Sequence, residues 1–135
     1  MHALSHIHAA LRPAGLLLDL HPDAMHSQIE VCIGGAIHRL GQLDETLHIQ
    51  DVRVARAARQ TTIDAGLFVL EREIRFTFVS HFGAVEAWLT YMAEHAQKAL
   101  IPAELVARAR ELLPPGAAGE VRVRRRIYAA RLRRA

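Results

Sequence analysis

Two side chains near the start of the chain could take part in binding chemistry: His21 and Asp23, on either side of Pro22. They directly follow a short apolar run at residues 16–20, and ligands of open α/β sheets bind where such strands end. An imidazole and a carboxylate at this place are candidates for a substrate-side loop. A turn, in which Pro22 sets the bend and Asp23 caps the next helical turn, is the more common role of such residues and is favoured.

Histidine is frequent, with nine residues in the chain, and imidazole is a common zinc ligand. His6 and His8 lie two positions apart, so on a helix they point to different sides. Five others would converge only if the fold brought them together: His21, His26, His38, His48 and His81. No Cys cluster accompanies them, so the sequence predicts no specific metal site.

Arginine is concentrated at the end of the chain, where seven residues lie between Arg122 and Arg134. Such a segment could meet the phosphates of a nucleic acid. Apolar residues alternate with the arginines here, which instead indicates a strand whose solvent face carries Arg122, Arg124 and Arg126. We therefore favour a basic strand over nucleic-acid binding, and strong salt dependence of binding to DNA or RNA would favour the alternative.

The length of 135 residues and a hydrophobic content of 51% fit one domain with a real core, residues 1–135. Cys32 is the only cysteine, so it forms no intramolecular disulfide, and it is expected to be an inert buried thiol. The first residues show no signal-peptide pattern, and the apolar runs are too short to cross a bilayer. These features predict a cytoplasmic protein that does not bind membranes.

A helix is predicted at the start of the chain, because Leu4, Ile7 and Leu11 recur at helical spacing. The turn at residues 12–15 ends this helix before a strand at residues 16–20. Because this run is almost continuously apolar, we expect it to be buried on both faces. Two short strands, Gln28–Ile33 and residues 36–40, flank Gly34-Gly35, a hairpin signal. A partly exposed helix is expected at residues 46–66.

The clearest strand is Phe68–Phe82, in which Ile74, Phe76 and Phe78 fall on one face. A helix with Trp88 and Met92 in its buried stripe follows from residue 85 to about residue 100. Pro102 begins a second helix, and Glu120–Arg134 is the last strand.

Residues 3–22, ALSHIHAALRPAGLLLDLHP, resemble a signature of class I S-adenosylmethionine-dependent methyltransferases. In that family a helix ends in a Leu-Arg/Lys-Pro-Gly-Gly turn and leads into the fifth strand of the sheet; Ala14 here replaces the first Gly. The later elements agree in order, since the family ends in an antiparallel strand pair at one edge of the sheet. The Gln28 to Leu40 hairpin is an addition.

The resemblance implies an α/β fold, or α+β by strand direction. We expect a truncated Rossmann-like methyltransferase sheet with one parallel strand, an antiparallel C-terminal strand pair and the added hairpin, with helices packed on it. It places His21 on the substrate side. The family's glycine-rich cofactor loop has no counterpart here, since the chain contains no Gly-x-Gly-x-Gly. No catalytic, metal or S-adenosylmethionine-binding residue is therefore expected, and the chain alone is not expected to be active.

A strand like residues 16–20 would lack a neighbour in such a truncated sheet, and natural proteins rarely leave an apolar edge bare. The hairpin could cover it, two copies could pair, or a separate chain could supply the missing half. We favour a homodimer through the sheet edge or hairpin.

Three functions follow from these alternatives. The first is a non-catalytic, methyltransferase-like domain that acts as a small homodimeric binding or structural module. The second is the substrate-side half of a methyltransferase, completed by upstream sequence or by a partner chain. The third is a basic α+β domain that binds nucleic acid.

Overall fold

A computed structural model describes residues 2–135, and the first residue of the predicted domain lies outside this range. The helices and strands follow in the order α1 (His2–Ala10), β1 (Leu16–Pro22), β2 (Gln28–Ile33), β3 (Ala36–Gln42), α2 (Thr46–Asp64), β4 (Phe68–Phe82), α3 (Val85–His95), α4 (Ala103–Leu112) and β5 (Glu120–Arg134). Of the helices in the described part of the chain, none is long and apolar enough to cross a bilayer.

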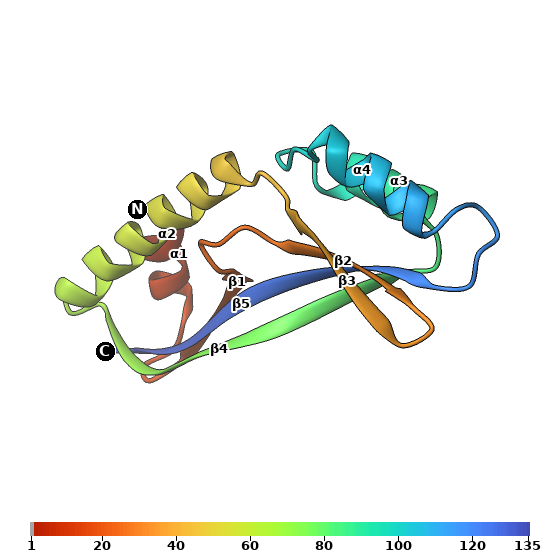
Figure 1. Ribbon diagram of the computed structural model, residues 1–135. Helices are drawn as coiled ribbons and strands as arrows, with labels where there is room; N and C mark the ends of the chain where they lie inside the picture. The colour runs from red at the N-terminus through yellow and green to blue at the C-terminus, as the bar shows by residue number, and fades with distance from the viewer. Residues whose placement is uncertain (1) are drawn as a thin grey trace.

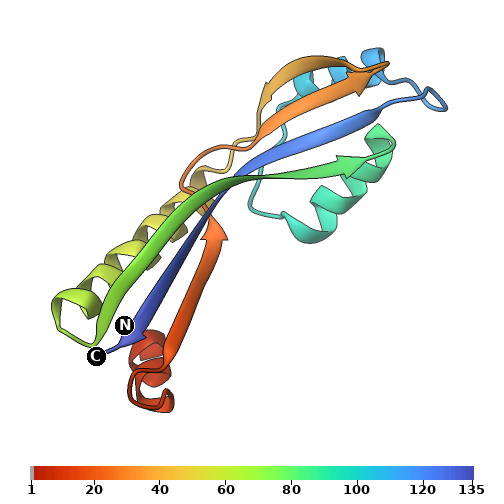
Figure 2. The ribbon, with the colours of Figure 1, turned by 90° about the horizontal axis from the view of Figure 1, so that it is seen from below.

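The five strands form one sheet in which β5 is the central strand (Figures 1 and 2). On one side β4 pairs with β5 along its whole length. On the other side β2 pairs with residues 120–124 of β5, and β1 pairs with residues 127–133. Strands β1 and β2 therefore lie end to end along the same neighbour, and β3 extends the sheet beyond β2.

The mixed α/β composition and the antiparallel pair of β4 and β5 are confirmed. The predicted parallel strand is not found, because β1 has only β5 as a neighbour in residues 2–135 and runs antiparallel to it. All the strand pairings described are antiparallel, so the Rossmann-like character that was expected of the sheet is not confirmed. Helix α3 ends at His95 rather than near residue 100.

Residues 16–20 form the predicted strand, but the prediction that it is buried on both faces is wrong. Leu17 packs under α1, whereas Leu16, Leu18 and Leu20 are 52%, 73% and 66% exposed. The turn at residues 12–15 folds α1 back over one face only, and the other face of β1 stays open. A continuous run of leucines is typical of a doubly covered strand, so the sequence pattern alone could not reveal the open face.

The hairpin at Gly34-Gly35 is confirmed. Both glycines have left-handed backbones, with φ of 55° and 82°, as the tight turn between two antiparallel strands requires. Through β2 the hairpin lies beside the first part of β5, beyond the end of β1. It therefore does not cover the outer edge of β1. Of the three possible partners for that edge, a second copy and a separate chain remain.

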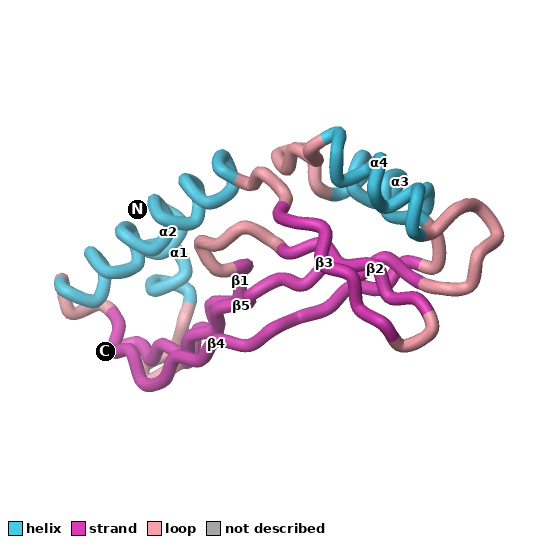
Figure 3. The backbone as a smooth tube through the Cα atoms, viewed as in Figure 1, coloured by secondary structure: helices cyan, strands magenta, loops and turns pink. Residues whose placement is uncertain are grey.

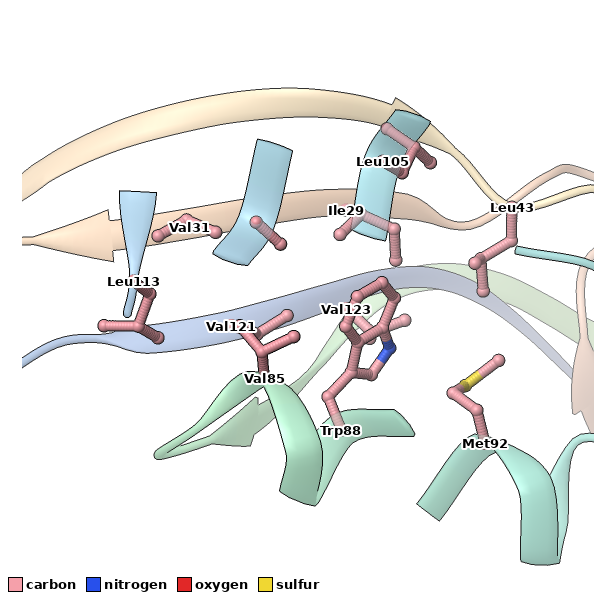
Figure 4. Close-up of a cluster of buried hydrophobic side chains, with 11 residues drawn as sticks. Ile29, Val31, Leu43, Val85, Trp88, Met92, Leu105, Leu113, Val121 and Val123 are labelled. Atoms are coloured by element: carbon pink, nitrogen blue, oxygen red, sulfur yellow. The ribbon is translucent and has the colours of Figure 1, made fainter. Parts of the chain in front are cut away.

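Helices α3 and α4 form a core with β2 and the first part of β5 (Figure 4). Trp88 and Met92 are buried there, as predicted, against Val121 and Val123 of β5. Ala109 of α4 is fully buried in the same cluster, where its small side chain lets the helix approach the sheet closely.

Helices α1 and α2 cover the other end of the sheet, as Figure 3 shows. Their core contains Phe68, Tyr128, Ala130 and Leu132. Val121 and Val123 have odd numbers in β5, whereas Tyr128, Ala130 and Leu132 have even ones. Because side chains alternate along a strand, the two helix pairs cover opposite faces of β5 at its two ends.

Candidate interaction surface

The structure brings the two predicted site residues together, but into packed surroundings. Asp23 is buried, accepts hydrogen bonds from Arg56 and from the Ala24 N–H, and lies 3.4 Å from Arg75. The His21 ring stacks on Tyr128 with 5.1 Å between centroids, and its Nδ1 lies 2.8 Å from the Pro22 carbonyl. Both side chains are held by neighbours within the fold. His21 and Pro22 still belong to β1, and a bend at residues 24–25 follows Asp23 in place of the expected helical turn.

Tyr128 is the centre of the polar cluster between α2 and the sheet. Its hydroxyl donates a 2.7 Å hydrogen bond to Glu73. The guanidinium groups of Arg56, Arg59 and Arg75 lie 4.8, 4.7 and 5.1 Å from its ring centroid. Burial, followed by the hydrogen bond to Glu73, raises the pKa of Tyr128. Arg56 and Arg75 pair with Asp23, and Arg59 pairs with Asp19, so the cluster joins α2 to the sheet as a network of compensated charges.

The predicted basic face is present, but its charges are compensated. Arg122 donates a 2.5 Å hydrogen bond to Glu120, and Arg124 a 3.1 Å hydrogen bond to Glu30. Arg126 lies 3.7 Å from Asp23. The hydrogen bond from Arg122 is the main reason why the pKa of Glu120 is lowered. Because each of the three arginines has an acidic neighbour, the face offers a nucleic acid little free positive charge.

The structure shows no histidine cluster of the kind that a metal site needs in the part of the chain that it describes. Within residues 2–135, no group of three or more His, Cys, Asp or Glu side chains is arranged to hold a metal ion. His48 lines a cleft of about 480 Å³ between α2 and the loop after α3, together with Glu45, His95 and Arg125. Glu45 there is buried and accepts a 2.6 Å hydrogen bond from the Ser27 N–H and a 3.3 Å one from the half-buried Arg125, so its charge is compensated within the fold.

The two adjacent glycines lie at the tip of the hairpin between β2 and β3, where a Cβ added to Gly34 or Gly35 would meet no atom within 4 Å. His21 and Asp23 are engaged in internal contacts. Cys32 is half-buried in β2 and not fully buried as predicted.

An open apolar surface lies on the face of β1, β5 and β4 opposite to α1 and α2, and we call it the open face. Leu20 and Ile74 lie on either side of Ala129, and Phe76 lies opposite Ile127. Its large exposed side chains are Leu16, Leu18, Leu20, Ile74, Phe76 and Phe78. A contiguous group of this kind on a surface marks a place of interaction.

The outer edge of β1 borders the open face. The Arg134 N–H donates to the Gly15 carbonyl, and the Asp23 N–H to the Arg126 carbonyl, both at 2.8 Å. Hydrogen-bonded pairs alternate with non-bonded pairs in an antiparallel ladder, so the odd-numbered residues of β1 bond to β5. The even-numbered residues Leu16, Leu18 and Leu20 therefore direct their N–H and C=O groups outward, where no strand of the described chain pairs with them.

No protein family, curated protein or solved structure matches this chain. The candidate site therefore depends on its own geometry.

Sequence reasoning found part of this surface and missed the rest. The alternation in β4 placed Ile74, Phe76 and Phe78 on one face, as the structure shows. The leucines of β1 were expected to be buried, so their share of the surface was missed. One available signal was the number of helices between residues 2 and 135, which is too small to cover both faces of the sheet at both of its ends.

Proposed function

We propose that this domain is a non-catalytic assembly module that forms a homodimer by pairing the outer edges of two β1 strands. The observation that supports it is the row of outward N–H and C=O groups at Leu16, Leu18 and Leu20, on a strand whose side chains are also apolar. A bare edge of this kind is a template for pairing, and soluble proteins rarely leave one open.

A two-fold axis perpendicular to the sheet pairs the two edges antiparallel and keeps the open faces on the same side. With the axis at Leu18, the two copies of Leu18 form a hydrogen-bonded pair, and Leu16 pairs with Leu20 of the second copy. The alternative axis at Asp19 would oppose two carboxylates and would leave Leu16 opposite Pro22, which has no N–H. The register centred on Leu18 is therefore favoured.

A Leu18→Pro substitution tests this pairing. It removes an outward N–H and none of the hydrogen bonds to β5, and proline is tolerated on an edge strand in this orientation. We expect the wild-type chain to sediment as a dimer at high micromolar concentration and the Leu18→Pro variant to sediment as a monomer with an unchanged circular dichroism spectrum. The control Leu18→Ala keeps the N–H and should remain dimeric. A monomeric wild type at that concentration would contradict the proposal.

A second candidate function is the substrate-side half of an S-adenosylmethionine-dependent methyltransferase. It is supported by the resemblance of residues 3–22 and by the antiparallel pair of β4 and β5, in which β4 is an edge strand. In this case a strand of a partner chain, rather than a second copy, would occupy the edge of β1. One-to-one binding of S-adenosylmethionine in a calorimetric titration would contradict the non-catalytic module. Without binding, sedimentation separates the two candidates, because the assembly module is a dimer by itself whereas the enzyme half, whose β1 edge awaits a partner chain, is a monomer.

A further inference from the structure

The sheet has two uncovered regions, and they differ in chemistry. The region opposite to α3 and α4 carries Arg122 and Arg124, charged side chains of the kind expected on a solvated face, and Arg124 covers and pairs with the buried Glu30. The open face, opposite to α1 and α2, carries instead leucine, isoleucine and phenylalanine. Because the same sheet supplies polar residues where it faces water, the apolar residues of the open face indicate that another element covers them.

The open face has the shape of a trough. Its ridges are the leucines of β1 and, on β4, Ile74, Phe76 and Phe78. Its floor is β5, where Ala129 is small, and a depression of about 400 Å³ lies at this point. Two inter-strand spacings separate the ridges by about 9.5 Å, which matches the diameter of an α-helix with its side chains, about 10 Å. The seven residues of β1 give the trough a length of about 20 Å, which corresponds to about 13 helical residues.

One end of the trough is positively charged. Arg131 and Arg133 share one carboxylate, Glu71, at 2.9 and 2.8 Å. The side chain of Arg72, which lies opposite Arg131, forms no hydrogen bond or ion pair within residues 2–135. At the other end Arg125 is neutralised by Glu45. Asp19, at the rim, is paired with Arg59 on the opposite face. Three guanidinium groups and one carboxylate give this end of the trough a net positive charge, which favours an acidic ligand. The same charge disfavours a second copy of the chain packed face to face.

We propose that the open face binds an amphipathic α-helix of another protein, about 13 residues long. The helix presents apolar residues at positions i, i+3, i+4 and i+7 to the trough and carries acidic residues at the end that lies over Arg72 and Arg131. This surface is separate from the β1 edge, because its decisive residues Arg72, Ile74 and Phe76 belong to β4 on the far side of β5.

The probe is a fluorescent peptide of about 14 residues with leucines at helical spacing and three glutamates at one end. Its controls are the same peptide with lysines in place of the glutamates and a scrambled peptide of equal composition. Anisotropy with the full chain should show binding of the acidic helix and weaker binding of both controls.

Two variants in β4 test the site. Arg72→Glu should weaken binding of the acidic peptide about three- to tenfold and strengthen binding of the lysine peptide. The matched control Arg108→Glu makes the same charge change on an exposed position of α4 and should alter neither. Phe76→Asp should abolish binding of both while the circular dichroism spectrum is unchanged.

Equal binding of the acidic and scrambled peptides would overturn the inference, as would binding that Arg72→Glu and Phe76→Asp leave unchanged. Sedimentation of the same samples separates this result from the proposed dimer. A dimer that binds none of the peptides overturns only the helix site, and a monomer that binds the acidic peptide through these residues overturns only the edge pairing.

Discussion

At the scale of single residues, the polar cluster around Tyr128 explains what His21 and Asp23 do in this fold. Asp23 is buried, and burial alone would raise its pKa. Hydrogen bonds from Arg56 and from the Ala24 N–H, together with the charges of Arg56 and Arg75, outweigh burial and lower the pKa below its ordinary value of 3.8. A carboxylate whose charge is stabilised in this way holds the turn after β1 against α2 and β4.

This cluster predicts a pH dependence of stability. Because the pKa of Asp23 is lower in the folded than in the unfolded chain, its stabilisation is complete above the ordinary value of 3.8 and is lost as the pH falls through the lower folded pKa. Asp23→Asn should therefore lower the free energy of unfolding at pH 7 and lessen its decline in acid. Urea unfolding of both proteins at pH 7 and below pH 4 measures this, and parallel pH profiles for the two would contradict the assignment.

At the scale of elements, most of the secondary structure could be predicted from local pattern. Gly34-Gly35 specified a hairpin, and alternation specified both the extent of β4 and the face on which Phe76 lies. The direction and burial of β1 could not be predicted, because leucines on both faces of a strand are compatible with either one or two covering layers. The outward N–H groups at even positions follow only from the register with β5, a contact of residues far apart in sequence.

The hairpin provides a test at this scale. Gly35 has a φ of 82°, and a Cβ added there would meet no atom within 4 Å, so Gly35→Ala acts through backbone strain alone. It should destabilise the fold by about 1–2 kcal/mol. Gly83→Ala is the matched control, because it also meets no neighbouring atom and its backbone is not left-handed. Chemical denaturation of both should show a loss for Gly35→Ala only; equal losses would refute a left-handed requirement at the turn.

At the scale of the whole molecule, the strands of a single twisted sheet are covered by helices on opposite faces at opposite ends. This arrangement leaves one charged and one apolar region uncovered, and the difference in chemistry between them is what supports an interaction surface on the apolar one. The protein in isolation should therefore behave as a folded chain with an exposed apolar patch.

This leads to a solution test of the open face. Ile74→Lys places a charge at the centre of the patch, at a side chain that is 45% exposed and so contributes little to the core. We expect lower fluorescence of a bound hydrophobic dye and less light scattering, with unfolding changed by less than about 0.5 kcal/mol. Val54→Lys changes another exposed apolar residue, which lies on α2, and should affect neither signal. Equal effects of the two substitutions would show that the open face is not a distinct patch.

The central position of β5 has a consequence for how the protein is made. Strands β1, β2 and β4 each pair with β5, which follows all of them along the chain. During synthesis the β2–β3 hairpin can form early, but the rest of the sheet has no partner until β5 leaves the ribosome. The leucines of β1 and the aromatic residues of β4 are then exposed on a nascent chain that cannot yet fold, so contact with chaperones is expected at this stage of translation.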